Sequence, residues 1–166
     1  MKFSETENVY PTFYKTAMYL IDNAFFFRRT LPKLFESNYD FEYAERICKT
    51  GFTALDSDWN KYYKTVHRLI DFSMEFLKLQ VGLKKTGKYQ YSTFQEIIDN
   101  VYSKTEEGPD YLWPLYFSEI FWKVHYRFVD FFIKKFVNSN TKEGNILEIP
   151  LGSGYFLCEF LRKNRS

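Results

Sequence analysis

The segment at residues 145–164, NILEIPLGSGYFLCEFLRKN, is the part of this chain whose residue types and spacing could do chemistry. A short apolar run carries an acid, Glu148, and leads through Gly152 and Gly154 into an amphipathic stretch. Glycine permits a tight turn and a close approach of the backbone to a ligand. The first N–H groups of a helix attract polar or anionic groups, and an acid beside them can bond ribose hydroxyls. The segment therefore predicts one corner of a nucleotide-type site.

Residues 148–154, EIPLGSG, resemble the first motif of class I S-adenosylmethionine-dependent methyltransferases. That motif has an acid followed by three alternating glycines after the first strand. Two of the three glycines match, and Pro150 stands in place of the first, where it removes an N–H donor and fixes φ. The resemblance covers about 20 of the 166 residues. The family's second acid, at the end of its second strand, has no counterpart.

The resemblance implies S-adenosylmethionine as cofactor and methyl transfer to a small molecule by direct displacement at the sulfonium. It places Gly152 and Gly154 along the methionine and ribose part of the cofactor. Glu148 would organise the loop, and Ser153 and Tyr155 would supply N–H groups at the start of the following helix. The resemblance names no catalytic residue.

Other candidate motifs are better explained by structure than by chemistry. His67 and Asp71 are four residues apart and could pair as a base and its orienting acid, but no nucleophile pattern accompanies them. Neither His67 nor His125 has a second ligand at metal-binding spacing, so no metal site is predicted. Residues 82–89 have the glycine and lysine spacing of a P-loop, but Tyr89 replaces the required Ser or Thr. A basic surface loop is expected there.

The composition is that of one globular unit with an aromatic core. Hydrophobic residues make up 45% and aromatic residues 22%, with 19 Phe and 14 Tyr. A net charge of +2, with the basic residues scattered among 21 acids, argues against nucleic acid as a partner. The two cysteines form no paired motif, and reduced, buried thiols are expected. No leader or long apolar run is present, which favours a cytoplasmic protein without a membrane partner.

Apolar spacing and breaker residues predict a mainly α chain of four or five main helices. The expected helices span residues 11–29, 41–49, 58–83 and 92–102, and a last one from residues 110–114 to about residue 137. Glu119 and Lys123 are spaced for an i,i+4 ion pair on the last helix. Residues 1–140 would form a helical lid or dimerisation domain. Residues 141–166 would begin an S-adenosylmethionine-binding domain, with a strand at 145–149, the turn and a helix.

The predicted fold is thus a helical bundle followed by the opening of an incomplete α/β (Rossmann-like) domain. A truncated chain is expected, inactive by itself, because the family's other strands are missing. A second hypothesis is a non-catalytic helical module, possibly a homodimer, whose Gly-Ser-Gly turn is only structural. A third is a binder of an apolar ligand. Phe25, Phe26 and Phe27 in succession require at least one ring to face away from the core unless that helix is central.

Overall fold

The computed structural model describes residues 1–36, 38–102, 108–138, 147–149 and 152–164. Within these residues the fold is mainly α, as predicted, and no β-strand is present. The longer helices are α2 (Pro11–Asn23), α3 (Phe25–Phe35), α4 (Phe41–Ala54), α5 (Trp59–Thr86), α7 (Gly108–Phe121), α8 (Lys123–Phe132) and α9 (Tyr155–Asn164). The shorter elements are the 3₁₀ turn η1 (Phe3–Glu5), α1 (Thr6–Val9), α6 (Phe94–Ile97), and the π-helical turns η2 (Ile98–Tyr102) and η3 (Ile133–Val137).

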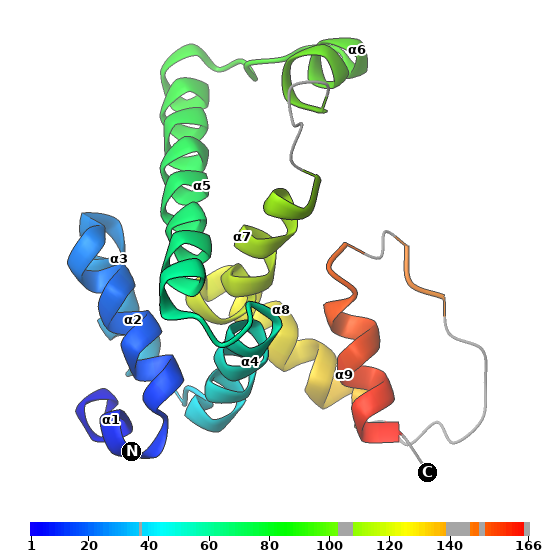
Figure 1. Cartoon of the computed structure of the whole chain (residues 1–166). Coiled ribbons are helices and arrows are strands. Elements are labelled where there is room, and N and C mark those ends of the chain that lie inside the picture. The colour runs from blue at the N-terminus through cyan, green and yellow to red at the C-terminus, as the bar shows by residue number, and fades with distance from the viewer. Residues whose placement is uncertain (37, 103–107, 139–146, 150–151, 165–166) are drawn as a thin grey trace.

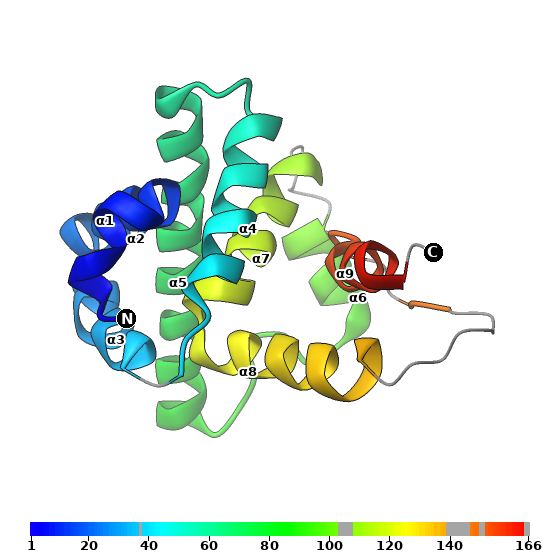
Figure 2. The same cartoon turned by 90° about the horizontal axis from the view of Figure 1, so that it is seen from below.

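The centre of the fold is a bundle in which α2 packs against α3, α4 and α5, and α7 packs against α5 and α4. Figure 1 shows α5 extending well beyond this bundle, with α6 at its far end. Helix α8 crosses beneath the bundle and brings its C-terminal end, continued by η3, to α9 (Figure 2). The bundle thus sets the direction of α8, and α8 in turn provides a wall for α9.

The core is built largely from aromatic rings, as the composition predicts. Phe13 is fully buried among the rings of Phe35, Phe41 and Phe121, with centroids 5.3 to 6.0 Å away. Buried hydroxyls are partnered across helices, since Thr16 and Tyr62 share a hydrogen bond of 2.9 Å. The largest fully buried side chains are Tyr62, Phe13, Phe27, Phe117, Phe121, Leu20, Leu31, Leu69 and Ile120.

The three successive phenylalanine rings of α3 differ in burial, as expected. Phe27 is buried, Phe26 packs partly against the core, and Phe25 is 69% exposed. The predicted helix of residues 11–29 is in fact two helices, because Ala24 adopts an extended conformation (φ −143°, ψ 119°) between α2 and α3. The helix predicted at residues 41–49 continues through Gly51 to Ala54 as α4. Gly51 lies inside α4, where a Cβ would stand 3.1 Å from the ring of Phe117.

Trp122 divides the last long helix, which the sequence pattern predicts to be continuous. It is extended (φ −105°, ψ 124°), its indole N–H donates to Ser73 Oγ at 3.1 Å, and its ring stacks on Phe72. The contacts of Trp122 with α5 therefore stabilise an extended residue where a continuous helix was predicted. The predicted ion pair between Glu119 and Lys123 is absent in this described part of the chain, because the i,i+4 spacing brings side chains together only within one continuous helix.

The predicted strand at residues 145–149 is not borne out where the structure can be read. Residues 147–149 are described and form no strand, whereas residues 145–146 lie outside the described residues. A strand needs a neighbour to complete its backbone hydrogen bonds, and none of the described residues offers one. The helix predicted after the glycine turn is present as α9. The domain boundary near residue 140 also lies outside the described residues and stays a prediction.

The cysteines differ from each other in environment. Cys48 is buried, and burial raises the pKa of its thiol to about 12. Cys158 is exposed on α9, so the expectation of two buried thiols is wrong for it. A helix long and apolar enough to cross a membrane is not found among the described residues.

Candidate functional site

The glycine turn before α9 has the conformation that its sequence predicts. Gly152 has φ +54° and Gly154 has φ +70°, both in the left-handed region that residues with side chains rarely adopt. A Cβ built on Gly152 would meet nothing within 4 Å. Gly152 is therefore required by the backbone path rather than by a close neighbour, and the space beside it is open.

Glu148 fastens the preceding segment to the start of α9. Its Oε2 accepts a hydrogen bond of 3.0 Å from the N–H of Leu157, the third residue of the helix. A carboxylate at a helix N-terminus is stabilised by the unpaired N–H groups and by the helix dipole. Among the described residues, the N–H of Phe156 has no acceptor. At the corner formed by Glu148, the glycine turn and the first turn of α9, one N–H group is thus bonded to Glu148 and another is available to a ligand.

The predicted site residues lie in different surroundings within this corner. Ser153 is exposed, and Gly154 is half-buried. The Tyr155 side chain is buried against the rings of Tyr43 and Tyr116, with centroids 6.3 Å away in both cases. Only the backbone of Tyr155 is therefore available to a ligand at the corner.

Helix α9 is anchored to the bundle by a charged contact on its far side. Glu159, whose side chain is 5% exposed, receives two hydrogen bonds from the Arg46 guanidinium of α4, at 2.6 and 2.7 Å. Arg162 adds a longer contact of 3.2 Å. Bidentate pairing of this kind fixes direction as well as distance. The corner therefore has a defined position relative to α4.

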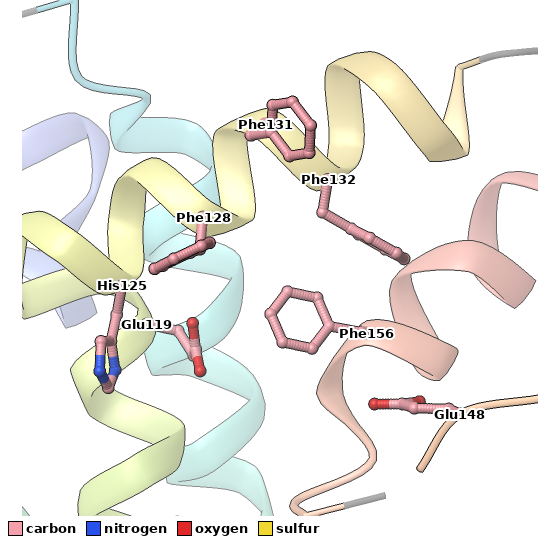
Figure 3. A pocket seen from close by; sticks show the side chains of 7 residues that line it. All are labelled: Glu119, His125, Phe128, Phe131, Phe132, Glu148 and Phe156. Atoms are coloured by element: carbon pink, nitrogen blue, oxygen red, sulfur yellow. The ribbon is translucent and has the colours of Figure 1, made fainter. Parts of the chain in front are cut away.

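A cavity of about 430 Å³ lies between α8 and α9 and reaches the corner. Figure 3 shows the residues that line it, which are Glu119, His125, Phe128, Phe131, Phe132, Glu148 and Phe156. The Phe132 and Phe156 rings meet edge to face, with centroids 4.9 Å apart. The space is open to solvent, since Phe128 and Phe131 are 62% and 63% exposed, and its volume is sufficient for a small molecule. The cavity joins Glu148, which the motif predicts as a site residue, to groups from α7 and α8.

His125, which follows the break at Trp122, is one of the residues that line this cavity. Its Nδ1 lies 2.7 Å from Ser118 Oγ, which in turn donates to the carbonyl of Leu115 at 2.6 Å. The single Ser118 proton is used in that bond, so Nδ1 carries the proton of the imidazole. Burial lowers the pKa of His125, which favours the neutral ring. His125 is thus a satisfied, half-buried histidine that borders a cavity.

Comparison with family models, with curated proteins and with solved structures finds no match to this chain. The resemblance to methyltransferases therefore rests on the residues of the corner.

Glu119 and His125 are site residues that the sequence pattern does not identify. Both were expected on one long helix, Glu119 as a polar residue of it, and the break at Trp122 brings them to the same cavity. No turn residue marks this break in the sequence. His67, by contrast, stays on the surface of α5, with its Nε2 4.0 Å from Asp71 Oδ1. Among the described residues, no group of three or more His, Cys, Asp or Glu side chains could hold a metal ion.

Glu119 should make the stability of the protein depend on pH. Burial raises its pKa to about 7, above a value of about 4.3 in an unfolded chain. Between these values the folded state binds the proton more tightly, so the free energy of unfolding falls as pH rises. Replacing Glu119 by Gln should remove this slope and stabilise the variant relative to wild type by about 3 kcal/mol more at pH 8 than at pH 4. Urea unfolding at both pH values measures the difference.

The comparison of variant with wild type separates the effect of Glu119 from that of His125, which lines the same cavity. The lowered pKa of His125 acts in the opposite direction, because it destabilises the fold as pH falls through that range. An equal pH dependence in wild type and in Glu119→Gln would contradict the raised pKa of Glu119.

Proposed function

We propose that this chain supplies the helical region and the first cofactor-binding turn of an S-adenosylmethionine-dependent methyltransferase that acts on a small molecule. The observation that carries the proposal is the corner before α9. There Gly152 and Gly154 are both left-handed, and Glu148 bonds the third N–H of the helix. A turn of this kind lets backbone N–H groups, rather than side chains, approach a nucleoside.

In this proposal the backbone from Gly152 to Tyr155 holds the methionine and ribose part of the cofactor, and Glu148 holds the turn. The cofactor supplies a methyl group on a sulfonium, which an acceptor displaces directly. The contribution of this chain is to hold the acceptor in line, which can lower the barrier substantially without an acid or base. The cavity between α8 and α9 is the acceptor site, because Glu148 and Phe156 belong both to it and to the corner.

The proposal also gives residues 145–149 the role of a first strand in an α/β (Rossmann-like) unit whose other strands are supplied from outside residues 1–166. Leu147 and Ile149 are 82% and 78% exposed, although both are strongly apolar. Apolar side chains of such strands are normally covered by neighbouring elements, so their exposure here supports the proposal. Residues 1–166 alone are then expected to bind the cofactor weakly and to be inactive in methyl transfer.

Weak cofactor binding can be tested by two-dimensional amide NMR with S-adenosylhomocysteine at millimolar concentration. We expect the signals of residues 152–157 to shift. Gly152→Val should reduce the affinity at least about tenfold, because valine is strained at φ +54° and fills the open space beside the turn. Gly87→Val is the matched control, since Gly87 has φ +67° at the remote end of α5.

Unmoved signals, or equal binding by wild type and Gly152→Val, would show the methyltransferase proposal to be wrong. The second candidate is then a helical interaction module. The observation in its favour is a stripe on α8 formed by Val124, Phe128 and Phe131, each 62% to 63% exposed. Self-association in sedimentation velocity that is lost in Val124→Ser, together with the absence of cofactor binding, would favour this candidate.

A further inference from the structure

We propose that the cavity between α8 and α9 binds a small organic cation, an amine carried on an aromatic or alkyl body. The evidence is the combination of ring faces and carboxylates around one space, with no lysine or arginine among the described residues that line it. As a statement about the methyl acceptor, this inference rests on the proposed function. As a statement about binding, it depends only on the cavity.

The rings of the cavity provide the apolar part of the site. Phe128 and Phe131 come from α8, Phe132 from its last turn, and Phe156 from the first turn of α9. Aromatic faces attract a cation within about 6 Å of the ring centre, and more strongly where water is excluded. Their edges and faces also bury an apolar body. Because Phe128 and Phe131 are 62% and 63% exposed, a ligand can enter without displacing a helix.

The carboxylates select the charge of the ligand. Figure 3 shows Glu119 and Glu148 reaching the cavity from opposite sides, one from α7 and the other from the segment before α9. Glu148 already accepts the hydrogen bond from Leu157, whereas Glu119 has no hydrogen bond or ion pair within the described residues. A ligand that fills the cavity removes water from both acids. With a neutral ligand Glu119 can stay protonated, because burial raises its pKa to about 7, whereas an ammonium group would pair with its ionised carboxylate.

The neighbouring histidine does not supply that charge. His125 donates its Nδ1 proton to Ser118, and burial lowers its pKa, so it remains neutral near pH 7. The charge that complements the carboxylates must therefore come from the ligand. The arrangement matches the aromatic and acidic surroundings in which proteins bind ammonium groups.

Binding of two probes of the same shape tests the inference. We expect 2-phenylethylamine, which is charged, to bind the 166-residue chain at least about tenfold more tightly than 2-phenylethanol, which is neutral. Glu119→Gln should lower this preference at least about fivefold and leave the alcohol affinity nearly unchanged. Glu75→Gln, an exposed acid on α5, is the matched control and should preserve the preference. Amide NMR titration at pH 7.5 reports the affinity of each probe for the wild type and for both variants, six affinities in all, and the location of each probe.

A second variant keeps the test decisive if Glu119→Gln fails to fold. Phe128→Leu preserves an apolar side chain at a 62% exposed position but removes a ring face, so the amine should lose affinity and the alcohol should not. Equal binding of amine and alcohol, or no binding of the amine, would overturn the inference even if S-adenosylhomocysteine shifts the corner. Amine binding without any effect of S-adenosylhomocysteine would support the cation site and contradict the methyltransferase.

Discussion

Replacing Phe13 by Ala should lower the free energy of unfolding by about 3 to 5 kcal/mol, the range typical of a buried phenylalanine. Phe13 is fully buried and meets the rings of Phe3, Phe35 and Tyr39, among others. Alanine would leave a cavity that rigid aromatic neighbours fill poorly. Since a domain of this size is stable by about 5 to 15 kcal/mol, the loss is a large part of the total. Urea unfolding followed by circular dichroism measures it.

Phe25→Ala is the control for this substitution. The same ring is removed, but Phe25 is 69% exposed and contacts chiefly the Arg29 guanidinium, 5.3 Å from the ring centre. A change below about 1 kcal/mol is expected. Comparable losses for the two variants would contradict a core centred on Phe13.

The second large effect is expected from Arg46→Ala. This change leaves the Glu159 carboxylate buried at the α4–α9 contact with only the longer Arg162 contact. Removing one partner of a buried pair costs about 3 to 5 kcal/mol, and since the Arg46 side chain is 33% exposed we expect the lower part of that range. Hydrogen exchange should also become faster throughout α9, because the helix loses its main polar anchor.

Arg162→Ala is the control, because it removes a contact to Glu159 from within α9 and leaves the contact between α4 and α9 in place. Arg162 contacts the same carboxylate, but its side chain is 48% exposed and lies on the same helix, so a loss below about 1 kcal/mol is expected. If Arg162→Ala destabilised the protein as much as Arg46→Ala, the helix would be held by its own charge pattern and not by α4.

The helices could be predicted where local signals agree with packing. Asp58 caps α5 at its predicted start by accepting from the N–H groups of Asn60 and Lys61. The helix end was predicted too early, at residue 83: α5 continues to Thr86, through part of the predicted basic loop, and Gly87 ends it in the left-handed conformation. The helix predicted at residues 92–102 begins at Phe94, after a capping box formed by Thr93 and Glu96. Such caps act within one turn of helix, and a single sequence contains all the residues they require.

The candidate site could be predicted only in part, for a physical reason. The glycine turn and Glu148 are close in sequence, and their conformation follows from local rules. The cavity depends on Trp122, whose extended backbone is stabilised by Phe72 and Ser73 of α5. That contact joins residues about fifty positions apart, so local spacing cannot reveal it. The same is true of Arg46 and Glu159, which are 113 residues apart.

The Arg46–Glu159 contact has a consequence for anyone who rebuilds this protein. If the corner segment were transplanted into another helical scaffold, it would keep its glycines but lose Arg46, which fixes the orientation of α9. The converse also holds: substitutions in α4 that never touch a ligand can re-aim the corner, since a tilt of a helix is amplified along its length. Directed evolution of ligand preference should therefore randomise the surroundings of Arg46 together with the cavity wall.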